Sequence, residues 1–247
     1  MKSILITGAN RGIGFGLVKH LIENPGPLKY LFATYRNPEK MKELQSVVCK
    51  HENVYLYQLD ITNFKDHDLL VQYIDKKTNG YGLNVLINNA GVSSKFTRIN
   101  LVKSEQMIEN FMTNAVAPLM MSKAMLPLLK KASASNASSA LGVHRAAIIN
   151  ISSVLGSIAK NDQGGFYPYR SSKAALNSIT KSLSIDVKND GILVTSLHPG
   201  WVKTDMGGPK ADLSVDASVQ AIVNTLNSLN EKHNGAFIQY DGTELPW

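Results

Sequence analysis

The stretch Thr7-Gly8-Ala9-Asn10-Arg11-Gly12-Ile13-Gly14 decides the fold, because it stands directly between a short apolar run and a segment with helical spacing. Its glycines follow the pattern G-x-x-x-G-x-G, and glycine lets a backbone turn tightly and approach a phosphate at a helix N-terminus. The stretch therefore predicts a strand, a phosphate-binding turn and a helix that hold a dinucleotide. A plain strand-to-helix turn with spare glycines is the alternative. The residues expected to contact the dinucleotide here are Gly8, Asn10, Arg11, Gly12, Ile13 and Gly14.

Short apolar runs alternate with helical patterns along the rest of the chain. Continuous β-branched runs of this kind are typical of strands buried on both faces of a parallel sheet. The predicted strands are Ser3–Thr7, Tyr30–Thr34, Val54–Leu59, Asn84–Asn88, Ala146–Ile151, Ile192–Leu197 and Ala236–Gln239. We therefore predict a single α/β domain over residues 1–247, a doubly wound, seven-stranded parallel sheet of the Rossmann type with helices on both faces. Ligands of such sheets bind outside the carboxyl ends of the strands.

Two segments in the middle of the chain have contrasting patterns. Apolar residues at helical spacing predict one long helix over Ser104–Lys131. The following stretch, Ala132–Gly142, is rich in Ser, Ala and Asn, and we expect it to be a mobile surface loop.

The composition excludes several classes of protein. The chain has one cysteine, Cys49, which rules out a disulfide framework and favours a cytoplasmic location. No apolar run is long enough to span a membrane, no signal peptide is recognisable, and the six histidines lack metal-ligand spacing. The net charge is +7, but the basic residues are spread along the chain, so a solvated surface is a better interpretation than nucleic-acid binding. We expect no metal, no nucleic acid and no membrane as partners.

The end of the second strand predicts which dinucleotide is bound. An acid about 20 residues past the glycines would bind the ribose 2′-hydroxyl of NAD, but this chain has Tyr35-Arg36 there. Arg36 is able to pair with a 2′-phosphate through two hydrogen bonds, and Arg11 is a second candidate for the same phosphate. Either arginine taken singly would ordinarily face solvent. Both together, with no acid beside them, predict NADP(H).

Other strand ends supply further candidate contacts for the cofactor. Asp60 ends the third strand and is able to accept a hydrogen bond from an adenine amino group or, equally, to cap the next helix. In Asn88-Asn89-Ala90-Gly91 small residues admit a ligand, and the asparagines are able to tie strand ends together. The Pro-Gly turn after the sixth strand would present polar groups to a nicotinamide carboxamide, although Pro-Gly alone is merely a turn. The contacts expected from these motifs are Asp60, Ile61, Asn88, Ala90, Gly91, Pro199, Gly200, Val202 and Thr204.

Tyr169 and Lys173 form the strongest chemical signal in the chain. They stand four residues apart, on one face of a predicted helix that begins near Pro168. The ordinary pKa of tyrosine is about 10, and a neighbouring ammonium together with the helix N-terminus is expected to lower it. Tyr167 lies off that face. In an arbitrary helix such a pair usually lies on the surface and has no function. The surrounding motifs favour a catalytic role here.

Two more polar residues are candidates for the chemistry. Ser153, at the end of the fifth strand, is able to stabilise charge on a substrate oxygen, and Ser152 is expected to support the backbone. Asn114 is an amide in an apolar stretch, where it either makes a structural hydrogen bond or holds a water near Lys173. His198 is interpreted as a strand-end residue.

These motifs, in this order, resemble the short-chain dehydrogenase/reductase family over the full length of the chain. Several stretches, among them SILITGANRG and SLHPGWVKTDMGG, are similar to the sniffer-type carbonyl reductases, close to the bacterial C-factor group. The resemblance implies NADP(H), the tetrad Asn114, Ser153, Tyr169 and Lys173, and a homodimer or homotetramer. The interval from Ser153 to Tyr169 is a few residues longer than usual in this family, which puts the shape of the substrate mouth in question.

The resulting hypothesis is an NADPH-dependent reductase of an aldehyde, ketone or quinone carbonyl, with Tyr169 as general acid. Lys173 would also hold the nicotinamide ribose, and residues 206–215 would form an open substrate lid. Two alternatives remain: an alcohol or hydroxysteroid dehydrogenase that acts oxidatively, and a dinucleotide-binding redox sensor with little turnover.

Overall fold

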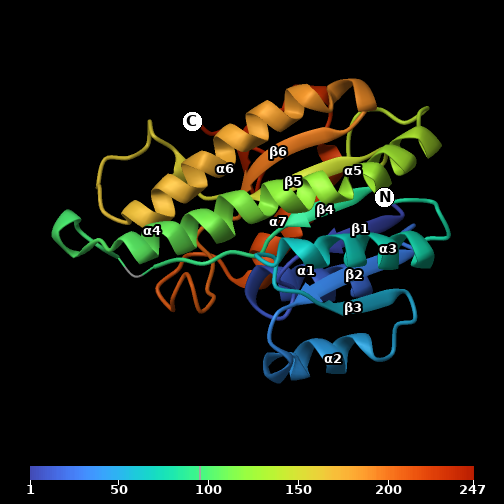
Figure 1. Cartoon of the computed structure of the whole chain (residues 1–247), viewed down its shortest axis with the longest axis horizontal. Helices are drawn as coiled ribbons and strands as arrows, with labels where there is room; N and C mark the ends of the chain where they lie inside the picture. Colours follow the sequence, from blue (N-terminus) through green and yellow to red (C-terminus); the bar gives the residue numbers. More distant parts are fainter. Residues whose placement is uncertain (95) are drawn as a thin grey trace.

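Seven parallel strands form one sheet in the order β3-β2-β1-β4-β5-β6-β7 (Figure 1). They are β1 (Ser3–Ile6), β2 (Tyr30–Tyr35), β3 (Val54–Gln58), β4 (Val85–Asn88), β5 (Ala147–Ile151), β6 (Leu193–His198) and β7 (Phe237–Gln239). The computed structural model describes residues 1–94 and 96–247, and of Lys40 the backbone alone. The predicted fold class is confirmed, and each predicted strand agrees with the structure to within one residue at either end.

Helices cover both faces of the sheet. They are α1 (Gly12–Glu23), α2 (Lys42–Val48), α3 (His67–Lys77), α4 (Ser104–Phe111), α5 (Ala117–Ser135), α6 (Tyr167–Asp186) and α7 (Val215–Ser228). Alternate residues of a strand point to opposite faces, so Ile4 and Ile6 pack with α1, α2 and α7. Leu5, between them, packs on the other face with α3 and α5. Both faces of β1 are therefore buried, as its unbroken apolar run predicts.

The order of the strands reverses at β1, which pairs with β2 on one side and with β4 on the other. In a doubly wound sheet, such a reversal opens a crevice outside the carboxyl ends of the strands. The loops that follow β4, β5 and β6 meet at that edge, on the left-hand side of Figure 1. The crevice is therefore the place to look for a site.

The long helix predicted over Ser104–Lys131 is interrupted. Helix α4 passes into a π turn, Met112–Val116, before α5 begins. A π turn holds more residues than an α-helical turn and is frequent at functional sites. It carries the buried Asn114.

The predicted mobile loop over Ala132–Gly142 is wrong for its first residues, because α5 runs on to Ser135. Ala132 and Ser133 are buried. The Ser133 hydroxyl donates to the backbone oxygens of Asp190 and Gly191, at 2.7 and 3.1 Å, and accepts from Arg145 Nε. Small side chains here serve close packing rather than freedom of the backbone.

Within residues 1–94 and 96–247, no helix is both long and apolar enough to cross a membrane. The same residues contain no group of three or more His, Cys, Asp or Glu side chains that could hold a metal ion.

Candidate active site

A cleft at the carboxyl edge of the sheet brings together most of the residues predicted from the sequence. Those that line it are Gly8, Asn10, Arg11, Gly12, Ile13, Arg36, Asp60, Ile61, Ala90, Gly91, Tyr169, Lys173, Pro199 and Thr204. Among the described residues, the predicted ones outside this lining are Gly14, Asn88, Asn114, Ser153, Gly200 and Val202. The lining also includes Met206, from the predicted lid, and residues that were not predicted to contact a ligand, namely Leu59, Asn89, Val92, Thr113, Ile151, Ser152 and Asp205.

The glycine turn is held close to the end of β4. Thr7 Oγ1 accepts hydrogen bonds from the backbone N–H groups of Asn89 and Ala90, at 3.0 and 3.1 Å. Gly8 has φ +66°, and a side-chain carbon there would lie 2.9 Å from the Ala90 Cα. At Gly14 a side-chain carbon would collide with the Gly8 carbonyl. Gly14 therefore allows close packing within the turn, while Gly8 and Gly12 line the cleft.

Asn88 and Asn89 divide their roles in a way that the sequence could not specify. Asn88 is buried, and its Nδ2 donates to Asn150 Oδ1 at 2.8 Å. This ties β4 to β5, as predicted for the asparagines, and turns the side chain away from the cleft. Asn89 is the one that lines the cleft, where its Nδ2 also donates to the Thr7 carbonyl at 2.9 Å.

Two acids and two arginines line the same cleft. Asp60 Oδ1 accepts from the N–H and the hydroxyl of Thr62, at 2.9 and 2.7 Å. Partial burial acts to raise the pKa of Asp60, but the Thr62 hydrogen bonds and the charge of Arg36 outweigh it and lower that pKa. Arg11 reaches across the cleft to Asp205, with Nη1 and Oδ2 2.8 Å apart. The two predicted arginines thus share one cleft, in which Arg11 is paired with Asp205 and the charge of Arg36 acts on Asp60.

Tyr169 lies in the first turn of α6 with its hydroxyl in hydrogen-bond contact with Ser153. Burial raises the pKa of Tyr169 to about 12, and the hydrogen bond with Ser153 acts in the opposite direction. The predicted lowering of this pKa by Lys173 is therefore wrong for the structure as it stands, because desolvation of the phenolate is the larger effect. At neutral pH the phenol keeps its proton.

Lys173 is buried beside Tyr169, with its Nζ 5.8 Å from the centre of the tyrosine ring. The ammonium donates to the Ile151 carbonyl at 2.7 Å, at the end of β5. Burial lowers the pKa of Lys173 to about 8. The side chain therefore stays largely charged at neutral pH and keeps two further N–H donors.

Asn114 acts as a clamp between three segments. Its Oδ1 accepts from the Val92 N–H at 2.9 Å, and its Nδ2 donates to the Val92 carbonyl and to Ser172 Oγ, at 2.8 and 3.0 Å. The structural hydrogen bond left open by the sequence is thus present. It fastens the loop after β4 to the π turn and to α6.

Ser152 supports the backbone, as predicted. Its hydroxyl donates to Asn177 Oδ1 at 2.7 Å, and Asn177 Nδ2 donates to the Gly156 carbonyl at 3.4 Å. Asn177 stands one turn beyond Lys173 on α6. This pair therefore holds the strand end that carries Ser153 against the helix that carries Tyr169 and Lys173. No sequence motif singled out Asn177.

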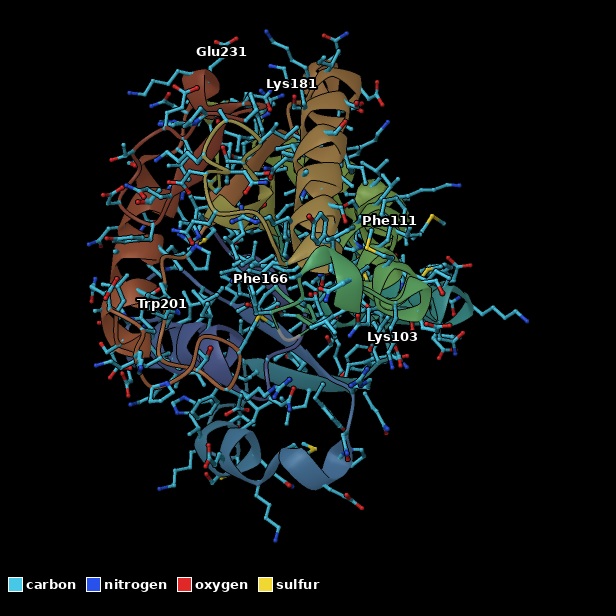
Figure 2. All side chains as sticks on the ribbon, turned by 90° about the vertical axis from the view of Figure 1, so that its left-hand side faces the viewer. Lys103, Phe111, Phe166, Lys181, Trp201 and Glu231 are labelled. Carbon is cyan, nitrogen blue, oxygen red and sulfur yellow. The ribbon has the colours of Figure 1, made fainter. Side chains whose placement is uncertain are left out.

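The longer interval before α6 ends in three left-handed residues. Gly164, Gly165 and Phe166 have φ values of +64°, +65° and +50°. The Phe166 ring packs edge-on against Phe96, with 4.9 Å between ring centres. Figure 2 looks onto the loop-bearing edge of the molecule, with Phe166 near the middle of the view and the half-exposed Trp201 to one side. Aromatic side chains thus stand on the face that carries the loops.

The segment after β6 folds back on itself. Trp201 Nε1 donates to the Gly207 carbonyl at 2.8 Å, and the Gly207 N–H donates to Thr204 Oγ1 at 3.1 Å. Val202 and Leu213 form an isolated β-bridge. Met206, in the predicted lid, lines the cleft.

A family model described as short chain dehydrogenase matches residues 2–214 of the chain. The chain belongs to this family. The resemblance stated from the motifs is therefore confirmed, and the matched residues contain the glycine turn and strands β1 to β6.

Individual relatives agree with this assignment. The carbonyl reductase Sniffer of D. melanogaster is 53% identical, with a TM-score of 0.98 over 100% of both chains. The NADPH-bound carbonyl reductase from chicken fatty liver is 41% identical, with a TM-score of 0.94 over 100% of this chain and 99% of that one. The C-signal protein of Myxococcus xanthus is 42% identical over 165 residues, which are 67% of this chain and 93% of that protein.

Proposed function

We propose that this protein is an NADPH-dependent carbonyl reductase in which Tyr169 donates a proton to the oxygen of an aldehyde, ketone or quinone. One observation carries the proposal. Tyr169 is in contact with Ser153 and lies beside Lys173, in a cleft that also holds two arginines. Family membership makes the chain an oxidoreductase, and its similarity to carbonyl reductases supports reduction of a carbonyl as the reaction.

The predicted cofactor, NADP(H), is confirmed as the dinucleotide held by a solved relative. The donor set of this chain fits that cofactor. Arg11 and Arg36 supply two guanidinium groups to one cleft, and such groups match a phosphate dianion better than a hydroxyl. The glycine turn brings backbone close to the start of α1, where a helix attracts phosphate.

When bound, NADPH supplies the hydride that reduces the carbonyl carbon. The residues of this chain stabilise and protonate the carbonyl oxygen. We assign Ser153 the role of donating to the carbonyl oxygen and stabilising the charge that develops there. Tyr169 then delivers its proton to that oxygen, and the raised pKa of about 12 keeps this proton in place at neutral pH.

Lys173 assists the same proton transfer through its positive charge. Its charge favours the phenolate that remains after proton transfer, and one of its N–H groups is fixed by the Ile151 carbonyl. The other N–H groups are free to hold the nicotinamide ribose. We assign Asn114 the task of fixing Val92 and Ser172 around this pair, and propose that a water beside it relays protons to Lys173.

The similarity to carbonyl reductases also bears on the direction of the reaction, since it favours a reductase over a dehydrogenase that acts oxidatively. A redox sensor would have no need for the Ser153, Tyr169 and Lys173 arrangement. We further propose a cytoplasmic, homo-oligomeric protein with residues 206–215 as the substrate lid.

The experiment that tests the proposal is Tyr169→Phe, with NADPH oxidation measured against a panel of quinones, aldehydes and ketones. Turnover is expected to fall at least about a hundredfold, the lower range of a lost general acid, while NADPH affinity is retained. Tyr167→Phe is the matched control, since Tyr167 is exposed and two residues away. Near-normal turnover by Tyr169→Phe would overturn the assignment. No turnover of any carbonyl by the wild-type protein would favour the sensor.

A further inference from the structure

The ion pair between Arg11 and Asp205 joins two segments that are 194 residues apart in the chain. Arg11 belongs to the glycine turn, one residue before α1, and Asp205 follows Thr204 in the segment after β6. Both side chains are largely exposed, with exposed fractions of 58% and 77%. The pair is therefore held by its own charges and not by surrounding packing.

The pair stands where two hollows meet. Arg11 and Asp205 line the cleft described above together with Arg36. They also line a second hollow, bounded by the start of α1, by residues before and within α2, and by Lys203. An anion that entered between Arg11 and Arg36 would lie next to the Asp205 carboxylate. The three charges therefore compete for one region.

We propose that Asp205 limits the preference of the cleft for NADPH over NADH, because it holds Arg11 in a pair that the 2′-phosphate of NADPH must break. This inference rests on the proposed use of NADPH by the same cleft. A phosphate dianion attracts a guanidinium more strongly than one carboxylate does, so Arg11 exchanges partners. NADH has no 2′-phosphate, and with it the pair stays closed.

The exchange of partners by Arg11 also affects the proposed lid, residues 206–215. The segment after Pro199 is closed on itself: the Lys203 N–H donates to the Leu213 carbonyl, and the Leu213 N–H donates to the Trp201 carbonyl, at 2.9 and 3.0 Å. The Arg11–Asp205 pair ties this self-contained segment to the glycine turn. Met206 follows Asp205 in the chain and lines the same cleft. Binding of the 2′-phosphate thus loosens the tie between the cofactor side and the lid side.

The test is Asp205→Asn, with the dissociation constants of NADPH and NADH measured on the full-length protein by fluorescence titration. Loss of the competing carboxylate is expected to tighten NADPH binding roughly three- to tenfold at low salt, as for one partly screened charge pair. The affinity for NADH is expected to change by less than about twofold, because an exposed charge has little effect on a ligand that does not engage Arg11. Asp212→Asn is the matched control, since it removes an exposed acid from the same segment without touching Arg11.

A second variant separates competition from a general effect of charge. In an Arg11→Met background, Asp205→Asn is expected to leave the NADPH affinity almost unchanged, because the partner of the pair is gone. Equal tightening of NADPH and NADH, or an equal effect of Asp212→Asn, would overturn the proposal. Weaker NADPH binding by Asp205→Asn would overturn it too, and would mean that Asp205 orients Arg11 toward the phosphate. Failure of the proposed function has a different signature, namely normal turnover by Tyr169→Phe or no preference for NADPH in the wild type.

Discussion

Ser152 donates a hydrogen bond to Asn177 at 2.7 Å, and both side chains are buried. The bond joins the end of β5 to the middle of α6. Ser153 and Tyr169 approach each other from these same two elements, so their contact depends on how the elements are fastened. Asn177 does not line the cleft, so we assign it the role of a positioning residue.

Asn177→Ala is expected to lower kcat about tenfold or more with a smaller change in KM, because Ser153 and Tyr169 lose their mutual registry. The unpaired Ser152 hydroxyl should also cost about 1–3 kcal/mol of unfolding free energy. Kinetics and urea unfolding measure the two effects separately. Ser178→Ala, at the next and exposed position of α6, is the control. A purely structural role would appear as lost stability with an unchanged kcat.

Gly165→Ala is expected to be more harmful than Gly164→Ala. Both glycines have left-handed φ values, so each alanine incurs a backbone cost of about 1–2 kcal/mol. At Gly164 nothing lies within 4 Å of an added carbon, whereas at Gly165 that carbon would collide with the Phe96 ring. Urea unfolding should therefore show an additional loss of about 1–3 kcal/mol at Gly165. Equal losses would mean that Phe96 moves aside freely.

Lys173→Met is expected to change how stability depends on pH. Burial holds the pKa of Lys173 at about 8, below the ordinary 10.5, so the unfolded chain keeps this proton to higher pH than the folded protein. Raising the pH from 7.5 to 9.5 should thus stabilise the wild type, relative to Lys173→Met, by about 2 kcal/mol. Urea midpoints across this range measure the difference. Lys181→Met, exposed on the same helix, should follow the wild type. Parallel curves for wild type and Lys173→Met would contradict the lowered pKa.

Ser133→Ala is expected to destabilise the protein by about 1–3 kcal/mol, because the part-buried Asp190 carbonyl, the buried Gly191 carbonyl and Arg145 lose the hydroxyl that they share. Ser135→Ala, exposed two residues later at the end of α5, should change stability by less than about 0.5 kcal/mol. Thermal unfolding of both variants, side by side, measures the difference. Similar melting temperatures would show that the end of α5 contributes little.

Local sequence pattern was sufficient for the sheet, since runs such as Ile4-Leu5-Ile6 and Ala147–Ile151 are buried on both sides and carry their own signal. It was also sufficient for the Tyr169 and Lys173 pair, because helical spacing alone puts both on one face. The extension of α5 through Ser133 was not predictable. It depends on carbonyls at Asp190 and Gly191, which come from a distant turn.

The same distinction applies to the site. Two pairs, Arg11 with Asp205 and Ser152 with Asn177, join segments that only the folded sheet brings together. Sequence spacing therefore does not predict them. The direction of the Tyr169 pKa was mispredicted for a related reason. A neighbouring charge can be read from a helix, but the extent of burial is a property of the whole fold.

The π turn at Met112–Val116 makes the number of residues in this helix as consequential as their identity. Because a π turn holds about one residue more than an α-helical turn, deletion of one residue there would restore a regular α-helix and leave the faces of α4 and α5 unchanged. It would change the direction in which the Asn114 side chain leaves the helix, and Asn114 would lose its register with Val92. Evolutionary change in this segment should thus proceed by substitution, with insertions and deletions confined to the loops on either side.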